Sequence, residues 1–269
     1  MCPLPSDVPP VVSWETFISA QVARNNASKR SVNPTTKRVT VEGIHRLYDG
    51  RTRSGKTTLM RIMNRMKKTS LVIGTKPGDP SLLDYVYREG YLRIDHWPPR
   101  PKELRQHGPY EQVKLLLWPE MKKYGDLRRY RSMYQAAIRD VSVEGAWTLS
   151  VDEGYWVCSH EGLDLGAEVS EIAYGGAGNG VSLHIAMQRP SGVPVIIHES
   201  SHELYQFRTG NTNSLRELAS YAGKSTRDFA AAVRGLNRGN PLRGHQFVHA
   251  PMTDGSEWEI CEVPASWAA

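Results

Sequence analysis

Nine consecutive residues match the G-x-x-x-x-G-K-[ST] pattern of a phosphate-binding loop. They are Gly50, Arg51, Thr52, Arg53, Ser54, Gly55, Lys56, Thr57 and Thr58. A Gly-rich turn of this kind directs backbone N–H groups at nucleotide phosphates, and the helix behind it adds its positive N-terminal end. Lys56 would reach the β- and γ-phosphates, and the Thr57 hydroxyl would hold Mg²⁺. The motif therefore predicts an ATP–Mg²⁺ site on a strand–loop–helix unit.

The flanking residues agree with that unit. Residues 39–48 are rich in β-branched and aromatic side chains, which predicts a strand, and residues 57–68 place apolar side chains at helical spacing. Arg53 is a departure, because many such loops have glycine there. A non-glycine residue restricts the backbone if that position needs a positive φ, and it adds a second cation beside Arg51.

Composition favours a soluble globular protein, with 39% hydrophobic and 23% charged residues. The longest apolar runs, such as 115–118 and 193–197, are too short to cross a bilayer, and we expect no signal peptide and no direct membrane span. Cys2, Cys158 and Cys261 form no C-x-x-C pair. This pattern is typical of reduced thiols in a cytoplasmic setting.

Positive charge is concentrated at the start of the chain. Residues 1–68 hold 13 Lys/Arg and 4 Asp/Glu, a balance of +9, whereas the whole chain carries +6. This asymmetry favours a polyanionic partner, namely nucleic acid. The alternative is that the cations balance bound phosphates and solubilise a tail.

The rest of the chain alternates between predicted strands and helices, which indicates a mostly parallel sheet flanked by helices on both faces, an α/β fold. The predicted strands are 70–75, 113–118, 146–151, 181–187 and 203–208, with closing strands at 246–249 and 258–263. The predicted helices are 126–140, 162–179, 214–222 and 226–236, of which the second ends in a Gly-rich turn, and 79–112 is predicted to be an irregular insertion.

Three regions follow from this pattern. Residues 1–38 form a basic, Pro-rich N-terminal arm with at most one short helix, residues 39–240 form the ATPase domain, and residues 241–269 form a tail with short strands.

Two carboxylates follow directly after the strand predicted at 146–151. Asp152 would bind Mg²⁺ through its water shell, and Glu153 would polarise the attacking water. An ordinary Asp-Glu at a strand end is the alternative, and the phosphate-binding loop upstream favours the catalytic pair. Gln188 follows the strand at 181–187, where a polar side chain would lie beside the γ-phosphate.

A second motif, His198-Glu199-Ser200-Ser201-His202, matches the H-E-x-x-H signature of zinc peptidases. That chemistry needs two histidines one helical turn apart. The preceding Val-Pro-Val-Ile-Ile is a poor helix start, the two serines weaken a helix interior, and no convincing third ligand follows. We therefore do not expect a zinc site.

In this order, the motifs resemble the FtsK–HerA class of DNA-translocating ATPases, which includes viral genome-packaging ATPases. The matching stretches lie roughly within 40–222: residues 50–58, Thr75-Lys76-Pro77, the strand into Asp152-Glu153, and Gln188-Arg189-Pro190. The resemblance implies a RecA-like core of the additional-strand, catalytic-glutamate type. It also implies that Gln188 is the sensor and that Arg208, or less favourably Arg189, is an arginine finger.

The resulting hypothesis is an ATP-driven translocase of double-stranded DNA that works without sequence preference as a homo-oligomeric ring, a hexamer, in the host cytoplasm or the virion. A capsid vertex or membrane proteins are further partners to expect. The alternatives are a DNA-transfer ATPase of a plasmid or integrative element and a phage assembly ATPase that does not act on DNA. A small-molecule P-loop kinase is disfavoured by Glu153.

Overall fold

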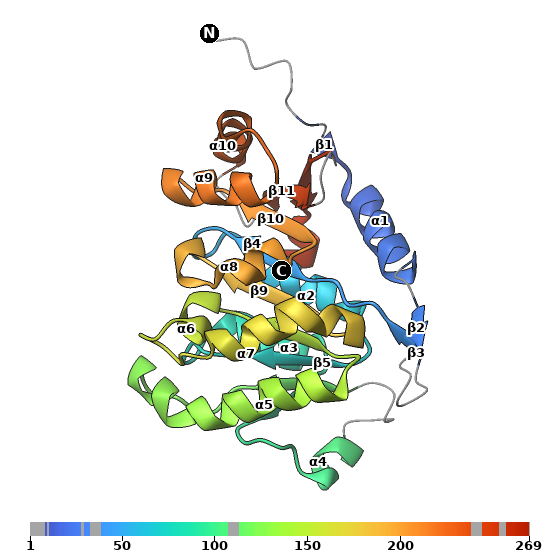
Figure 1. Cartoon of the computed structure of the whole chain (residues 1–269), viewed down its shortest axis with the longest axis vertical. Helices are drawn as coiled ribbons and strands as arrows, with labels where there is room; N and C mark the ends of the chain where they lie inside the picture. Colours follow the sequence, from blue (N-terminus) through green and yellow to red (C-terminus); the bar gives the residue numbers. More distant parts are fainter. Residues whose placement is uncertain are drawn as a thin grey trace.

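The computed structural model describes residues 9, 11–27, 30–32, 39–106, 113–237, 244–252 and 257–268. In this part of the chain, ten strands form one sheet, and helices cover both of its faces (Figure 1). The order of the strands is β1-β12-β11-β10-β4-β9-β8-β5-β7-β6. The α/β class predicted from the sequence is thereby confirmed.

Seven neighbouring strands run parallel and form the centre of the sheet. They are β4 (Arg46–Asp49), β5 (Ser70–Ile73), β6 (Leu92–Ile94), β7 (Lys114–Leu117), β8 (Thr148–Val151), β9 (Ser182–Met187) and β10 (Glu203–Phe207). Strand β9 lies between β4, which leads into the phosphate-binding loop, and β8, which leads into Asp152. The family resemblance implies a core with an additional strand, and β9 is a strand inserted in this way between β4 and β8.

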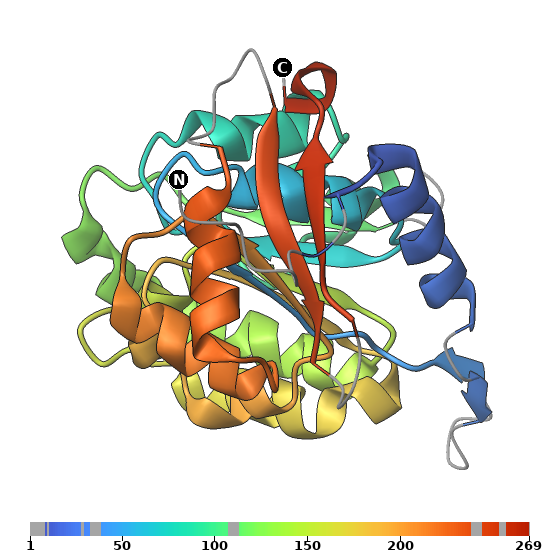
Figure 2. The same ribbon diagram turned by 90° about the horizontal axis from the view of Figure 1, so that it is seen from above.

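Helices α2 and α3 lie on one face of the sheet, and α5, α7 and α8 lie on the other (Figure 2). Their bounds are α2 (Lys56–Arg65), α3 (Pro80–Tyr87), α5 (Arg131–Glu144), α7 (Gly166–Glu171) and α8 (Val195–Glu199). The remaining helices are α1 (Trp14–Ala27), α4 (Pro101–Gln106), α6 (Gly154–Cys158), α9 (Thr212–Tyr221), α10 (Thr226–Gly235) and α11 (Ala265–Ala268). Among the described residues, none of the helices combines the length and the apolar character needed to cross a bilayer.

One sequence-based prediction of local structure is wrong. The segment predicted as irregular contains α3, β6 and α4, because the Asp79 side chain caps α3 and β6 pairs with β7; its residues 107–112 lie outside the described residues. The helix predicted over 162–179 begins later, at Gly166, and ends in a Gly-rich turn as predicted, since α7 is followed by a π-helical turn (Ile172–Gly176) and a 3-10 turn (Ala177–Asn179). The glycines in this stretch favour such irregular turns over a continued α-helix.

Strands from both ends of the chain extend the central sheet beyond β10. Strand β11 (His245–Pro251) is antiparallel to β10, β12 (Glu259–Val263) is antiparallel to β11, and β1 (Val11–Val12) is parallel to β12. A separate pair joins β2 (Arg30–Val32) to β3 (Val39–Val41). The segments predicted as an arm and a tail thus both contribute to the sheet, and residues 1–8, 10, 28–29, 33–38, 238–243, 253–256 and 269 lie outside the described residues.

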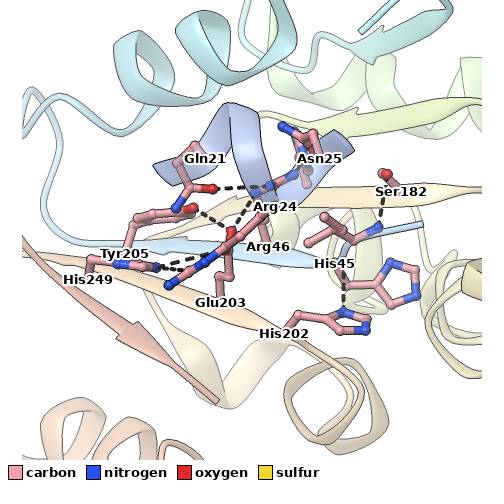
Figure 3. A network of polar contacts seen from close by, with 12 residues as sticks. Gln21, Arg24, Asn25, His45, Arg46, Ser182, His202, Glu203, Tyr205 and His249 are labelled. Carbon is pink, nitrogen blue, oxygen red and sulfur yellow. Dashed lines mark hydrogen bonds and ion pairs between the residues drawn. The ribbon is translucent and has the colours of Figure 1, made fainter. Parts of the chain in front are cut away.

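A buried polar network joins α1 to the sheet (Figure 3). Arg46 is fully buried, and its Nε donates to Glu203 Oε2 at 2.6 Å, while its Nη1 is 3.1 Å from His184 Nε2. Two side chains of α1 reach the same pair: Gln21 Oε1 accepts from Arg46, and Arg24 donates to Glu203 Oε1 at 2.8 Å. The network lies where β4 and β10 begin, at the edge of the sheet opposite the phosphate-binding loop.

His249 belongs to this network and makes the stability of the fold depend on pH. Burial alone would lower the pKa of His249, but hydrogen bonds and charge from Glu203 and Glu259 outweigh burial and raise it. A histidine with a higher pKa in the folded state than in the unfolded state stabilises the fold. This contribution is complete when the pH is below the pKa of the unfolded state, about 6.5, and it is lost as the pH rises through the pKa of the folded state. We expect the free energy of unfolding of wild type to be higher than that of His249→Gln. This difference should be larger at about pH 6 than at about pH 9. Urea unfolding at both pH values measures this, and a difference that does not vary with pH would contradict it.

Candidate nucleotide site

The phosphate-binding loop connects β4 to α2 through a backbone with three positive φ angles. Gly50 has φ 152°, Arg53 has φ 61° and Gly55 has φ 104°. Arg53 therefore takes a left-handed conformation without the freedom of glycine, at a cost of roughly 1 kcal/mol. At Gly55 a side chain would also collide with its surroundings, since a Cβ there would lie 2.7 Å from His245 Cγ.

We expect Gly55→Ala to weaken ATP binding by about tenfold or more, because the loop must move to relieve both the strain and the collision. Gly78→Ala is the matched control: Gly78 also has a positive φ (62°), but a Cβ there would have no atom within 4 Å. Equilibrium titration with a fluorescent ATP analogue measures both variants. Equal affinities for the two would show that the loop tolerates a side chain at residue 55.

Lys56 begins α2 and lies within the curve of the loop. Its Nζ donates to the carbonyl oxygens of Gly50 and Arg51, at 2.7 Å in each case, and the side chain is buried. Burial lowers the pKa of Lys56 to about 8, although Asp49 and Glu153 act in the opposite direction. The ammonium group is thus held inside the loop that would surround the phosphates.

Thr57 and Asp152 come together from α2 and the end of β8. The Thr57 hydroxyl donates to Asp152 Oδ1 at 2.7 Å. A hydroxyl and a carboxylate are hard oxygen ligands of the kind that Mg²⁺ prefers, and Mg²⁺ in such sites completes its octahedron with water and phosphate oxygens. The two side chains therefore fit an Mg²⁺ ion that accompanies a nucleotide.

Glu153 and Gln188 are linked to the phosphate-binding loop by a chain of hydrogen bonds. Gln188 Nε2 donates to Glu153 Oε2 at 2.9 Å, and the Thr52 hydroxyl donates to Gln188 Oε1 at 2.9 Å. Gln188 follows β9 directly, so the inserted strand is what brings it between the loop and Glu153. A side chain in this place can respond to the phosphate end of a nucleotide.

Lys76 is a further residue of the site, and sequence reasoning gave it no role. It follows β5, and its Nζ lies 3.3 Å from Asp152 Oδ2 and 3.3 Å from Glu153 Oε2. The only signal in the sequence was its position in Thr75-Lys76-Pro77, directly after a core strand. Because β5 neighbours β8 in the sheet, residues that follow these two strands meet at one edge.

Arg208 lies beside the phosphate-binding loop of its own chain. With Arg51, Arg53 and Arg234 it lines a cavity of about 450 Å³, and its Nη1 donates to the carbonyl of Leu236. Its role as a finger that reaches a neighbouring subunit stays a prediction. Arg189, the alternative finger, lies over the ring of Tyr155.

The H-E-x-x-H stretch does not form one continuous helix. Helix α8 ends at Glu199, between the two histidines. The ring of His198 stacks on Tyr221, and His202 Nδ1 accepts a hydrogen bond from the backbone N–H of His45. In this geometry the two rings are held by separate parts of the core, unlike those of a peptidase zinc helix.

Part of the basic charge near the start of the chain is used inside the fold. Arg61 is buried and paired with Glu89 at 2.9 Å, and Arg65 pairs with the same carboxylate at 2.7 Å. Arg46 is likewise buried against Glu203. These three cations are engaged with carboxylates of the chain itself, so the balance of +9 overstates the charge that this region offers to a partner.

The sequence matches no protein-family model and no curated protein at a significant level. Solved structures do match. The genome packaging NTPase B204 from Sulfolobus turreted icosahedral virus 2, in complex with AMPPCP, is 17% identical over 83% of this chain and 98% of that chain, with a TM-score of 0.56. The DNA-packaging ATPase B204 from Sulfolobus Turreted Icosahedral Virus is 15% identical over 82% of this chain and 97% of that one, also at 0.56.

A secretion ATPase has a similar fold. The cytoplasmic domain of the Type VII secretion ATPase EccC from Thermomonospora curvata is 16% identical over 82% of this chain and 25% of that chain, with a TM-score of 0.53. At such identities the likeness is one of fold. The fold of this chain, a mostly parallel sheet flanked by helices, is therefore similar to that of solved packaging and secretion ATPases.

Proposed function

We propose that this protein hydrolyses ATP and uses the free energy to move double-stranded DNA, as the motor that packages a viral genome. The observation that carries the ATPase part is the position of Glu153. Its carboxylate lies beside the Thr57–Asp152 pair and is held by Gln188, which is itself bonded to the phosphate-binding loop. This is the set of groups that hydrolysis of a nucleoside triphosphate requires.

In the proposed reaction, a water oxygen bonds to the γ-phosphorus as the bond from that phosphorus to the β,γ-bridging oxygen breaks. The products are ADP and inorganic phosphate, and the proton of the water passes to the Glu153 carboxylate. Lys56 and the backbone N–H groups of the loop would bind the phosphates, and Thr57 and Asp152 would hold the metal. Mg²⁺, when bound, neutralises charge on the β- and γ-phosphate oxygens.

A short segment after β7 supports the DNA part of the proposal. Lys122, Lys123, Arg128 and Arg129 are exposed, and none of them forms an ion pair within the described part of the chain. Buried Met121 and Leu127 anchor the segment. Because β7 is parallel to the other central strands, it ends at the same edge of the sheet as β4. The segment with these cations therefore leaves the sheet at the edge where the phosphate-binding loop begins. Contacts of this kind grip phosphates without reading sequence.

The test compares the double variant Arg128→Gln/Arg129→Gln with a control of equal charge, Arg216→Gln/Arg227→Gln, whose arginines are exposed on α9 and α10. We expect the first variant to lose about tenfold in affinity for unrelated DNA duplexes and to lose DNA stimulation of ATP hydrolysis, with DNA-free hydrolysis unchanged. Titrations at two salt concentrations should show that the DNA affinity of that variant depends less on salt than the DNA affinity of wild type does. No DNA binding and no stimulation in wild type would refute DNA as the partner.

The likeness to EccC, a secretion ATPase, favours a second candidate, an ATPase that moves protein or virion components. Hydrolysis that duplex DNA leaves unchanged would favour this candidate. A DNA-transfer ATPase of a mobile element would respond to DNA as a packaging motor does, and neighbouring capsid or relaxase genes would separate the two.

We also propose a homo-oligomeric ring, a hexamer, in which Arg208 completes the site of a neighbouring subunit. Mixing Arg208→Ala with Lys56→Ala subunits tests this, because some interfaces would then pair an intact loop with an intact arginine. Activity that recovers on mixing would support the ring, and full activity of a strict monomer would refute it.

A further inference from the structure

The backbone that carries Lys76 is held in place by side chains from two other elements. The Tyr134 hydroxyl, from α5, donates to the carbonyl of Gly74 at 2.9 Å, and Trp118 Nε1, which follows β7, donates to the carbonyl of Lys76 at 3.1 Å. Gly74 has no room for a side chain, because a Cβ there would lie 2.9 Å from Trp118 Cδ1. The turn after β5 therefore directs Lys76 toward one place.

That place is the gap between two adjacent carboxylates. The side chains of Asp152 and Glu153 are 0% and 5% exposed, and that of Lys76 is 21% exposed. The ammonium group of Lys76 thus lies between two buried acids that would otherwise repel each other.

The individual oxygens of these two carboxylates contact different side chains. Asp152 Oδ1 accepts from Thr57, and Oδ2 faces Lys76. Glu153 Oε2 faces Gln188 and Lys76 together, and neither contact uses Oε1. Two donors on one oxygen restrict rotation of the carboxylate, and the other oxygen is left to accept a proton.

We propose that Lys76 is a positioning residue for ATP hydrolysis, which holds Glu153 by Oε2 so that Oε1 is presented to the attacking water. This inference rests on the proposed ATPase function and assigns a role within its site. Of the two contacts at Oε2, a Glu153 without the ammonium group beside it would keep only the one with the amide of Gln188. The carboxylate would then leave the position from which it accepts a proton, and the turnover rate would fall although the phosphates would still bind.

Three variants test the proposal. Lys76→Met keeps the length of the side chain without its charge, Lys76→Arg keeps the charge, and Lys68→Met makes the same replacement at an exposed lysine of the described chain. Each is examined for kcat and KM of ATP hydrolysis, for ATP affinity by equilibrium titration with Mg²⁺ and a fluorescent analogue, and for Tm. Lys76→Gln replaces Lys76→Met if the latter does not fold.

We expect Lys76→Met to lower kcat roughly 10- to 100-fold with ATP affinity within about threefold of wild type. Lys76→Arg should recover much of the rate, because a guanidinium can donate to both carboxylates, and Lys68→Met should match wild type. In single-turnover measurements, the double variant Lys76→Met/Glu153→Gln should hydrolyse ATP at the same rate as Glu153→Gln alone. The reason is that the carboxylate that Lys76 positions is already absent.

A wild-type kcat for Lys76→Met would overturn the proposal. So would a loss of ATP affinity as large as the loss of rate, or losses that multiply in the double variant with Glu153→Gln, since either result would mean that Lys76 does not act through Glu153. A wild-type protein that hydrolyses no ATP refutes the proposed function first and this inference with it. Hydrolysis that DNA does not stimulate refutes only the DNA partner, and the comparison of variants still decides the role of Lys76.

Discussion

Glu153→Gln is expected to reduce ATP hydrolysis by roughly 10²–10⁴-fold, the usual contribution of a general base, while ATP binding stays close to that of wild type. The carboxamide keeps the shape of the side chain and a hydrogen bond with Gln188, but it cannot accept the proton of the attacking water. Steady-state phosphate release measures the first effect, and equilibrium titration with a fluorescent ATP analogue measures the second.

Two controls make this result specific. Glu171→Gln makes the same replacement at an exposed glutamate of α7 and should leave the rate unchanged. Lys56→Ala should lose tight ATP binding itself, because it removes the ammonium group enclosed by the loop. If Glu153→Gln turned over ATP at the wild-type rate, another group would have to be the base.

Arg46→Met should lower the free energy of unfolding by about 3–5 kcal/mol, the range measured when one partner of a buried ion pair is removed. Arg46 is fully buried and donates to Glu203, which is itself almost fully buried. Its removal leaves Glu203, whose side chain is 4% exposed, with Arg24, His249 and the Tyr205 hydroxyl. Urea unfolding followed by circular dichroism measures the change.

Arg24→Met is the matched control, because its side chain is 44% exposed and contacts the same carboxylate. Its loss should cost no more than about 1 kcal/mol, as for exposed ion pairs. Arg46→Met/Glu203→Gln should be less destabilised than Arg46→Met alone, since the uncompensated charge is gone. A cost below about 1 kcal/mol for Arg46→Met would mean that the network contributes little to stability.

Much of the nucleotide site could be predicted because its signals are local. The spacing from Gly50 to Thr57 and the helical pattern behind it specify a loop between a strand and a helix, and β4 and α2 lie there. Asp152-Glu153 was placed correctly at a strand end for the same reason. The strand at 181–187 was predicted from its own residues, and Gln188 follows the observed strand β9.

Other features depend on residues far apart in the chain. Strand β6 has three residues and is defined by its pairing with β7, so its own composition carries little signal. The role inferred for Lys76 depends on carboxylates 76 and 77 residues later, which meet it only because β5 and β8 are neighbours. A pattern that is read along the chain cannot report such a meeting.

Charge illustrates the same division. The count of Lys and Arg in residues 1–68 is a property of the sequence, and it favoured a polyanionic partner. The fold buries Arg46 and Arg61 against Glu203 and Glu89, and it leaves the cations of the segment after β7 exposed. Desolvation and pairing decide which cations a partner can meet, and both depend on tertiary neighbours.

The order of the residues alone predicts a phosphate-binding loop, a strand that is followed by two acids, and a mostly parallel α/β core. These are consequences of local spacing and hydrophobic periodicity, which act over a few residues. The order of strands that places Gln188 and Lys76 on Glu153, the joining of β1, β11 and β12 to the sheet, and the network under α1 arise only in the folded chain. They depend on which strands become neighbours, and that is decided by packing of the whole core.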